Sequence, residues 1–395
     1  MAGSHYISLA LKLARRAYGE TSPNPMVGAV LVKGGEIIGR GWHHRAGGPH
    51  AEIEALRDAE KKGNNVKGAT LYVTLEPCST HGRTPPCTDA IMSAGIKRVV
   101  VGTTDPNPKH AGAAFKILTR AGIKAGLVES EELANECAKL NEAFNHWIVH
   151  RTPFVTVKAA MTLDGKIATA TGESKWITGP AARAYGMKLR AGADAVLVGI
   201  NTVLADDPGL TVRTVKGSKF KVQSPRSKVQ SCKRRIILDS MARTPLRSKV
   251  VTDGFASMTT VVVSSAATKT RVKALGAKVK VLVAPAEKSA IIHQPPTINL
   301  RWLMRRLGAA NVTGLLVEGG GEVNASFLLG GFAHRIAFFY APKILSGRDA
   351  RKGVAGDGIA QIADMIKLEG VEWKWLGPDL LLTGSVGNRK VPKQA

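Results

Sequence analysis

The sequence is organised around two short runs: residues 49–56 read Pro-His-Ala-Glu-Ile-Glu-Ala-Leu, and residues 76–87 read Glu-Pro-Cys-Ser-Thr-His-Gly-Arg-Thr-Pro-Pro-Cys. Together they supply the imidazole of His50 and the thiols of Cys78 and Cys87. A tetrahedral zinc ion accepts these ligands, and three of them leave its fourth position open for a water molecule. Zinc lowers the pKa of such a water from about 15.7 toward about 7, which gives a hydroxide nucleophile at neutral pH.

Glu52 follows the proposed ligand His50 by two residues, so its carboxylate can take and return the proton of the water. The order His-x-Glu, then Pro-Cys and a second cysteine, is the signature of zinc-dependent nucleobase deaminases. The two cysteines are nine residues apart here, so we expect a loop between the thiolates. The alternative is an unrelated pair of thiols and a surface histidine, but it leaves the conjunction of these residues and their prolines unexplained.

The bulk composition describes an ordinary globular chain. Its 395 residues are enough for two or three domains. Four cysteines are too few for a disulfide framework, and thiolate ligands suit a reducing compartment, so we expect a cytoplasmic protein. The N-terminus lacks the basic and apolar regions of a signal peptide. Because no run of about 18 apolar residues occurs, we expect no membrane span.

The formal net charge of +26 is unusually high, and residues 216–235 contribute eight positive and no negative charges. This segment has little apolar periodicity, which predicts an exposed basic loop. Aromatic residues make up only 5% of the chain and do not alternate with basic ones, as a stacking surface for nucleic acid would require. We therefore expect no specific nucleic-acid partner.

The apolar pattern predicts two α/β domains. Residues 1–148 indicate a helix, a β-hairpin and then alternating strands and helices, ending with a helix over 131–149. Thr152-Pro153 marks a boundary, and a second α/β domain covers residues 152–385. The polar and basic residues 386–395 predict a flexible tail.

A glycine-rich run, residues 318–326, reads Glu-Gly-Gly-Gly-Glu-Val-Asn-Ala-Ser, follows a predicted strand and opens a helix. Backbone amides at such a helix start suit a pyrophosphate, although a run of this kind also serves as a tight turn. It is not G-x-G-x-x-G, so the usual dinucleotide fingerprint is absent. Asp206-Asp207-Pro208 likewise fits either a helix-capping turn or an acid–base pair.

Further motifs identify a family. They are Thr-Ser-Pro-Asn-Pro-Met-Val-Gly (21–28), Gly-Gly-Pro-His-Ala-Glu (47–52), Gly-Arg-Thr-Pro-Pro-Cys (82–87), Met-Thr-Leu-Asp-Gly-Lys-Ile-Ala (161–168), Ser-Lys-Trp-Ile-Thr-Gly (174–179), Ala-Asp-Asp-Pro-Gly-Leu-Thr-Val-Arg (205–213) and Leu-Val-Glu-Gly-Gly (316–320). With these motifs the chain resembles the bifunctional deaminase–reductases of riboflavin biosynthesis, from residue 5 to about residue 385. The resemblance implies an α/β chain with an N-terminal cytidine-deaminase-like three-layer domain and a C-terminal dihydrofolate-reductase-like α/β domain.

For the N-terminal half the resemblance implies deamination of 2,5-diamino-6-(5-phosphoribosylamino)pyrimidin-4(3H)-one, with release of ammonia. The Zn2+ would be held by His50, Cys78 and Cys87, and Glu52 would carry the proton. Four further residues match positions that line the substrate pocket in the family: Asn24, His43, Arg83 and Asn107. An amide and an imidazole can read the edges of a pyrimidine, and an arginine can bind a phosphate bidentately.

For the C-terminal half the resemblance implies NADPH-dependent reduction of the ribosyl to the ribityl group, which gives 5-amino-6-(5-phosphoribitylamino)uracil. The glycosylamine can open to an imine, so the protein must position hydride donor and acceptor and supply a proton. Residues that match cofactor contacts are Ala160, Trp176, Thr202, Asp206, Ser240, Gly320, Gly321, Glu322, Val323, Asn324, Ala325 and Ser326. Those that match substrate contacts are Lys158, Ser174, Arg190, Leu210, Arg213 and Glu318. Our hypothesis is that Lys158 or Asp206 is catalytic and helps to protonate the imine nitrogen.

The sequence departs from the family pattern at three places. Thr80 stands where a histidine is usual, Ala113-Ala114 replace a basic residue and a glycine, and His334-Arg335 stand where an acidic residue is commoner. The first two departures lie on the deaminase side, so a reductase with a weakened deaminase half is an alternative.

Two alternatives come from other functional classes. One is a nucleic-acid-editing deaminase with the basic loop as its RNA-binding arm, which would have no use for a nicotinamide-binding half. The other is a zinc-stabilised binding module without turnover, which would need no base such as Glu52. The family resemblance instead implies a homo-oligomer that acts on a phosphorylated pyrimidine.

Overall fold

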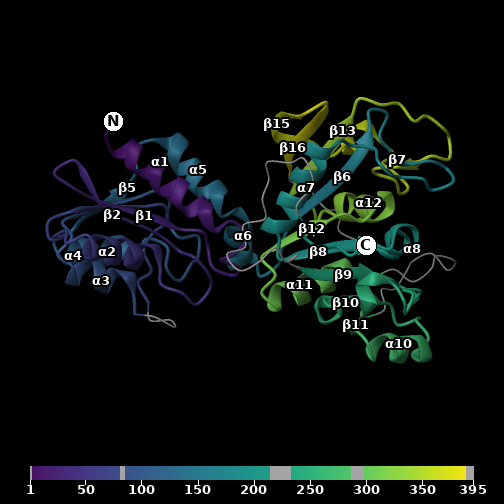
Figure 1. Cartoon of the computed structure of the whole chain (residues 1–395), viewed down its shortest axis with the longest axis horizontal. Coiled ribbons are helices and arrows are strands. Elements are labelled where there is room, and N and C mark those ends of the chain that lie inside the picture. Colours follow the sequence, from purple (N-terminus) through teal and green to yellow (C-terminus); the bar gives the residue numbers. More distant parts are fainter. Residues whose placement is uncertain (1, 81–84, 214–232, 286–297, 388–395) are drawn as a thin grey trace. The chain divides into compact units, whose positions relative to one another are not determined.

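The computed structural model describes residues 2–80, 85–213, 233–285 and 298–387. The chain forms two compact units, Met1–Arg151 and Thr152–Ala395 (Figure 1). The predicted substrate contact Arg83 and most of the predicted basic loop lie outside the described residues.

The N-terminal unit is built on a five-stranded mixed sheet with the order β2-β1-β3-β4-β5. Its strands are β1 (Gly28–Lys33), β2 (Glu36–Trp42), β3 (Thr70–Val73), β4 (Arg98–Val101) and β5 (Lys124–Leu127). Strands β1 and β2 form the predicted antiparallel hairpin, and its turn residues Gly34 and Gly35 have φ angles of 58° and 84° that favour glycine. Strands β3, β4 and β5 run parallel to one another.

Alternation of apolar side chains gives this sheet two buried faces. The face that contains Leu31 and Val99 packs against α2 (Ala51–Lys61), α3 (Cys87–Ser93) and α4 (Ala113–Arg120). The face that contains Val30 and Val100 packs against α1 (Ala2–Ala14) and α5 (Glu131–Leu140). The predicted three-layer α/β arrangement is confirmed (Figure 1).

The C-terminal unit is built on a nine-stranded sheet with the order β11-β10-β9-β8-β12-β6-β13-β16-β15. Its strands are β6 (Phe154–Thr162), β8 (Ala195–Gly199), β9 (Arg234–Leu238), β10 (Thr259–Val263), β11 (Lys280–Val283), β12 (Gly314–Val317), β13 (Arg335–Ala341), β15 (Leu368–Leu376) and β16 (Asp379–Val386). From β11 across the sheet to β13, every strand is parallel to its neighbours. The last two strands of the order, β16 and β15, are antiparallel to the strands beside them. Two short strands, β7 (Lys166–Ala168) and β14 (Arg351–Lys352), pair separately.

Helices cover both faces of the larger sheet. The face with Val155 and Leu197 packs against α11 (Leu300–Ala309) and α12 (Gly321–Leu329). The opposite face packs against α8 (Ile200–Asp206), α9 (Lys249–Thr252) and α10 (Lys269–Gly276) at one end and against α7 (Pro180–Gly192) over β13 and β16. The carboxyl ends of the parallel strands therefore meet at one edge, where open α/β sheets bind their ligands. None of the helices in the described ranges is long and apolar enough to cross a membrane.

Two predictions at the segment boundaries were wrong. The end of the expected exposed basic loop belongs to β9, and Arg235 within it is fully buried. Val386, which was expected in the flexible tail, is the last residue of β16, while residues 388–395 lie outside the described part of the chain.

The helix expected over 131–149 is interrupted at Asn141, between α5 and α6 (Glu142–His150). The side chain of Asn141 binds both backbone groups of Met26: Oδ1 accepts from its N–H at 2.7 Å, and Nδ2 donates to its carbonyl at 2.8 Å. The break between the two helices thus coincides with a contact to a distant segment.

Candidate active sites

The proposed zinc ligands come together in the N-terminal unit. Nδ1 of His50 lies 3.2 Å from Sγ of Cys87 and 3.5 Å from Sγ of Cys78. The three ligand atoms all lie within 4.8 Å of one another. Ligands about 2.0–2.3 Å from a tetrahedral zinc are separated by roughly 3.5 Å, so both the donor set and its spacing fit the metal.

The start of α2 places His50 and Glu52 at this cluster. His50 is the residue before the helix and has an extended backbone, while Glu52 lies in the first turn and is only 3% exposed. Gly41 of β2 allows the helix to lie this close to the sheet, because a Cβ there would collide with the carbonyl of Ala51 and the amide of Ala55. The helix start and the sheet therefore fix the ligand and the carboxylate together.

The two thiols hold their protons unequally. The hydrogen bond from Cys87, together with the nearby His50, lowers the pKa of Cys78 to about 4 against the opposing effect of burial. The pKa of Cys87 is raised, because its thiol is held in that hydrogen bond and is buried. A bound metal would take the place of this proton. Burial also raises the pKa of Glu52, which suits a group that takes up and returns a proton.

His43 and Asn24 lie beside the zinc cluster. The ring of His43 is 5.5 Å from that of His50 in an edge-on arrangement and is 2% exposed. Its Nδ1 lies 2.9 Å from the carbonyl oxygen of Pro49, and its Nε2 lies 3.2 Å from Nδ2 of Asn24. Nδ1–H therefore donates to the carbonyl and Nε2 accepts from the amide, as a neutral imidazole does. Burial lowers the pKa of His43, in agreement with this tautomer.

Asn107 lies in the loop between β4 and α4, and a buried carboxylate holds this loop. Glu76 is 4% exposed and stands two residues before Cys78. Its oxygens accept hydrogen bonds of 3.0–3.1 Å from the loop amides of Asp105 and Gly112 and from the amide of Ala114 in the first turn of α4. Sequence reasoning missed this role, although the acidic residue in Glu-Pro-Cys was the available signal.

The larger site of the C-terminal unit is a cavity of about 1420 Å³ at the carboxyl ends of β8, β9 and β12. Predicted residues that line it are Ser174, Thr202, Asp206, Ser240, Gly320, Gly321, Glu322, Val323 and Ser326. The side chains of Asn324 and Ala325 are buried instead, and Nδ2 of Asn324 donates to the carbonyl of Gly353 at 2.8 Å. Neither of these side chains lines the cavity.

Glycine is required where α12 begins at this cavity. Gly320 precedes the helix with a φ of 78°, which is in the left-handed region. A Cβ on Gly319 would overlap the side chain of Val323, so the loop and the first turn of the helix are in direct contact. Because Gly320 and Gly321 line the cavity, the unpaired amides at the helix start lie beside it and suit a pyrophosphate.

A second cavity, of about 350 Å³, holds most of the predicted substrate contacts. It is lined by Lys158, Arg190, Arg213 and Glu318, and also by the predicted cofactor contacts Ala160 and Trp176. Leu210 does not join this group, because its side chain is 2% exposed and packs in the core beneath α8.

Glu318 forms the charged centre of the smaller cavity. Its oxygens accept hydrogen bonds from Nε and Nη2 of Arg190 at 2.9 and 2.7 Å, and Nζ of Lys158 lies 4.0 Å away. Burial would raise the pKa of Glu318, but the charges of Arg190 and Lys158 outweigh it and lower the pKa to about 2. With Arg213 the cavity carries a net positive charge, which suits a phosphorylated ligand.

The two proposed catalytic residues of the reductase line different cavities. Lys158 lines the smaller cavity and Asp206 the larger one. Oδ1 of Asp206 lies 3.3 Å from Oγ of Ser174 and 3.3 Å from Nζ of Lys175. Trp176 then lines the smaller cavity, so residues 174–176 connect the two sites.

Three cations that sequence reasoning missed also line the larger cavity: Arg301, Arg351 and Lys352. Arg351 and Lys352 form the two-residue strand β14, which is too short to show periodicity in the sequence. The carbonyl of Lys352 would collide with a Cβ on Gly321, so β14 lies directly against the start of α12.

The chain matches two family models. Residues 2–103 match the cytidine and deoxycytidylate deaminase zinc-binding region, and residues 153–382 match the RibD C-terminal domain. The riboflavin biosynthesis protein RibD of Aquifex aeolicus is 44% identical, and the match covers 96% of this chain and 97% of that one. RibD of Escherichia coli is 40% identical, with 97% and 99% covered.

Solved structures agree with these matches. RibD of Acinetobacter baumannii is 36% identical with a TM-score of 0.80, and the match covers 98% of this chain and 99% of that one. The diaminohydroxyphosphoribosylaminopyrimidine deaminase/5-amino-6-(5-phosphoribosylamino)uracil reductase of Thermotoga maritima is 34% identical with a TM-score of 0.79 and the same coverage. The chain therefore belongs to the RibD family, the bifunctional zinc-dependent deaminases and NADPH-dependent reductases of riboflavin biosynthesis.

Proposed function

We propose that the N-terminal unit deaminates 2,5-diamino-6-(5-phosphoribosylamino)pyrimidin-4(3H)-one, in line with the name of the Thermotoga relative. The observation that carries the proposal is the cluster of His50, Cys78 and Cys87 with Glu52 buried beside it. Bound zinc would supply an activated water. Glu52 would take the proton of that water and deliver it to the departing amine, and His43 with its partner amide would position the pyrimidine.

In the C-terminal unit, NADPH would occupy the larger cavity and the ribosyl phosphate the smaller one. Hydride would pass from the nicotinamide to C1′ of the opened imine, and the imine nitrogen would gain a proton. Lys158 lines the smaller cavity, which supports it as the proton donor. Asp206 lines the larger cavity and contacts Ser174, which supports it as a group that positions the cofactor. Arg213 would bind the phosphate.

The test separates the two reactions in the purified, zinc-loaded protein. Ammonia release is followed with the diamino substrate, and NADPH oxidation with its deaminated product. Glu52→Gln should abolish the first signal and leave the second intact. Lys158→Ala should lower NADPH oxidation by on the order of 10²-fold and leave ammonia release intact. Unchanged NADPH oxidation by Lys158→Ala at saturating substrate would remove Lys158 as the proton donor.

The second candidate function is a reductase with a weakened deaminase half. Thr80 is exposed and stands two residues after Cys78, so a missing imidazole there affects the mouth of the zinc site. The change at Ala114 matters less, because Glu76 binds the amide of this residue and not its side chain. If the deaminase is weakened, Thr80→His should raise the rate of ammonia release, while an unchanged rate would argue against this candidate.

We propose that the protein forms a homo-oligomer through the edge of the larger sheet. Strand β15 lies at that edge, and Val371, Trp373 and Trp375 at alternate positions are 42%, 59% and 72% exposed. Exposed apolar edge strands are avoided in monomers, because their backbone groups pair with other chains. Light scattering should show a smaller particle for the variant Trp373→Glu with Trp375→Glu.

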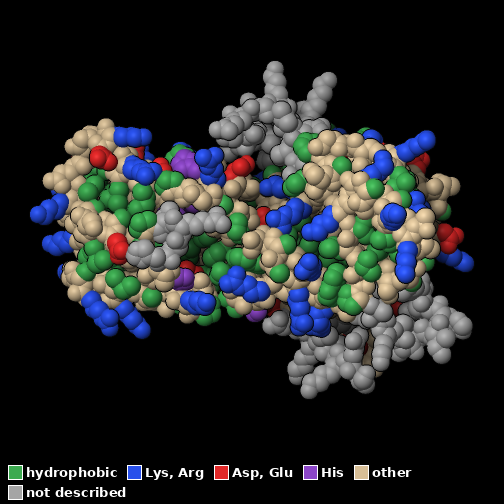
Figure 2. All heavy atoms as spheres, turned by 90° about the horizontal axis from the view of Figure 1, so that it is seen from below, with side chains coloured by type: hydrophobic (Ala, Val, Ile, Leu, Met, Phe, Trp, Pro, Cys, Tyr) green, Lys and Arg blue, Asp and Glu red, His purple; other side chains and the backbone are tan. Residues whose placement is uncertain are grey.

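The high positive charge of the chain is the one feature that an RNA-binding deaminase would also have. On the face that Figure 2 shows, Lys and Arg side chains are spread over the described residues of both units instead of gathering in one patch. We propose a phosphorylated small molecule as the partner on this ground. We also propose a cytoplasmic setting, since a reducing compartment keeps the zinc thiolates available. Salt-sensitive RNA binding without NADPH oxidation would favour the editing alternative.

A further inference from the structure

The loop of residues 206–213 joins the two proposed binding sites of the C-terminal unit. Asp206 at its start lines the larger cavity, and Arg213 at its end lines the smaller one. Between them the backbone has positive φ angles at two residues other than glycine, 40° at Asp207 and 50° at Leu210. Side chains rarely adopt this conformation, so the surrounding structure must hold the loop in place.

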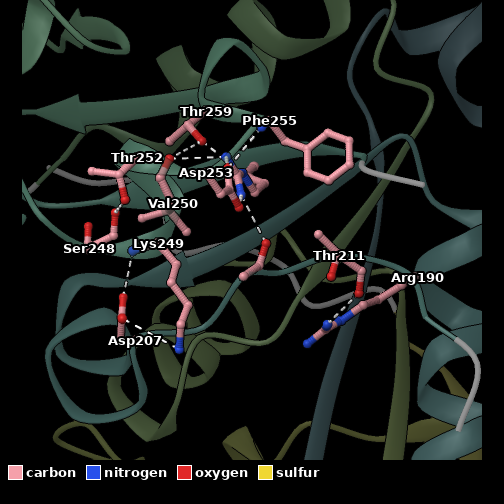
Figure 3. Close-up of polar contacts among 12 residues, drawn as sticks. Arg190, Asp207, Thr211, Ser248, Lys249, Val250, Thr252, Asp253, Phe255 and Thr259 are labelled. Atoms are coloured by element: carbon pink, nitrogen blue, oxygen red, sulfur yellow. Dashed lines mark hydrogen bonds and ion pairs between the residues drawn. The ribbon is translucent and has the colours of Figure 1, made fainter. Parts of the chain in front are cut away.

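Three hydrogen bonds hold the loop at every second residue (Figure 3). They are Lys249 N–H to Oδ1 of Asp207 at 2.8 Å, Arg235 Nη1 to the carbonyl of Gly209 at 3.0 Å, and Arg190 Nη1 to the carbonyl of Thr211 at 3.1 Å. Arg190 lines the smaller cavity, whereas Arg235 lines neither cavity. Arg235 therefore reaches the loop directly through the carbonyl of Gly209, without contacting either cavity.

The guanidinium of Arg235 is fully buried and uses all of its N–H groups. Nη1 and Nη2 bind the two oxygens of Asp253 at 2.6 and 2.8 Å. Nε donates to Oγ1 of Thr259 at 2.8 Å, and Nη2 also donates to the carbonyl of Val250 at 3.1 Å. A buried charge is tolerated when it is paired and hydrogen-bonded in this way. The cluster thus fixes the position of Gly209 relative to β9, α9 and β10.

We propose that Arg235, paired with Asp253, is a positioning residue for the reductase. By fixing Gly209 it holds the loop as one segment, with Asp206 at the cofactor and Arg213 at the substrate. The inference rests on the proposed placement of NADPH and substrate in the two cavities. A lysine cannot replace Arg235, because a single ammonium does not pair with both oxygens of a carboxylate and reach two carbonyls at the same time.

The test compares Arg235→Lys with Thr259→Val in the full-length protein, using NADPH and the deaminated substrate. Thr259→Val is the matched control, since it removes the hydroxyl next to Nε of Arg235 but leaves the bond to Gly209. We expect Arg235→Lys to raise the KM for NADPH and the KM for substrate, each on the order of tenfold. Thr259→Val should lower the Tm without changing either KM. Ammonia release by the N-terminal unit measures the amount of active protein.

Two outcomes overturn the proposal. One is that Arg235→Lys leaves both KM values within about twofold of the wild type. The other is that Thr259→Val raises them as much as Arg235→Lys does, which would make the effect a general loss of stability. If Arg235→Lys does not fold, Asp253→Asn is used with the same expectation, because it keeps the shape and removes the charge that holds the guanidinium.

Asp206→Asn and Arg213→Gln separate this proposal from the proposed function. If these variants change KM values and Arg235→Lys does not, the positioning role fails and the two binding sites stand. If none of the three variants changes a KM, the placement of the ligands in the two cavities fails as well.

Discussion

Arg190 and Glu318 form a bidentate pair, with Nε and Nη2 of the arginine 2.9 and 2.7 Å from the two carboxylate oxygens. The side chains are only 12% and 10% exposed. Arg190 comes from α7 and Glu318 directly follows β12, so the pair joins a helix to the sheet at the smaller cavity. Such a pair is costly to break from one side, because the charge that remains is buried and loses the short hydrogen bonds that compensate its burial.

Arg190→Met should destabilise the C-terminal unit. Glu318 would still have the cation of Lys158 4.0 Å away, but it would lose the two short hydrogen bonds from Arg190. Breaking a buried pair from one side typically costs about 3–5 kcal/mol. Denaturant unfolding followed by amide hydrogen exchange in β6 and β12 measures this loss. Adding Glu318→Gln should recover part of it, whereas simple additivity of the two changes would show that the pair is not coupled.

The same pair predicts how stability depends on pH. The folded protein lowers the pKa of Glu318 from its ordinary 4.5 to about 2. A lowered folded pKa adds stability that is fully present above about pH 4.5 and is lost as the pH falls through 2. The difference corresponds to roughly 3 kcal/mol. Urea unfolding between these pH values should give a flatter profile for Glu318→Gln, and an unchanged slope would assign the acid sensitivity to other groups.

The sequence predicted the structure well where a pattern of residue types is typical of one structure or one kind of site. Histidine, glutamate and two cysteines with nearby prolines predicted the cluster at Cys78, and a short continuous apolar run, residues 27–32, predicted strand β1. The strand signal is local, whereas the zinc signal joins His50 to cysteines 28 and 37 residues away and rests on the ligands that the metal accepts.

Prediction failed where a distant partner decides the environment. Arg235 ends a basic run that is typical of an exposed loop, but Asp253 and three further partners distant in the sequence allow it to be buried. Strand β15 was not predicted, although Val371, Trp373 and Trp375 alternate with Glu372 and Lys374 and were the available signal.

Removing one thiolate should separate zinc binding from reduction. Cys78→Ser and Cys87→Ser should each lower the zinc content and the ammonia release together, because a neutral hydroxyl is a poor replacement for a thiolate. Oxidation of NADPH with the deaminated substrate should remain, since the C-terminal unit has its own core. Cys137→Ser is the control: this thiol is buried in α5 outside the cluster, so zinc should be retained. Full zinc content in both ligand variants would contradict the assignment.

Glu76→Gln should impair the deaminase without releasing zinc. The carboxylate accepts from two loop amides and from one amide in the first turn of α4, whereas an amide side chain offers one oxygen and a second group that can only donate. The loop with Asn107 should therefore loosen, and the KM of the deaminase should rise by on the order of tenfold. Zinc analysis and ammonia kinetics at several substrate concentrations test this. If zinc is lost together with activity, the role of Glu76 is instead to hold the zinc ligand Cys78 in position.

Arg351 should bind a phosphate of NADPH. It lines the larger cavity on β14, which lies against the glycine-rich start of α12. A charge-assisted hydrogen bond contributes about 1.5–3 kcal/mol, so Arg351→Gln should raise the KM for NADPH by roughly tenfold or more with little change in kcat.

Arg348→Gln is the matched control for this prediction, since it removes the same charge from an exposed position three residues earlier. NADH then identifies which phosphate is bound. If Arg351 contacts the 2′-phosphate, the variant should discriminate less between NADPH and NADH, because only the former loses a contact. If Arg351 contacts the pyrophosphate, both KM values should rise together. An equal KM for NADPH in wild type, Arg348→Gln and Arg351→Gln would show that the cation faces solvent and that the amides of Gly320 and Gly321 bind the phosphates without it.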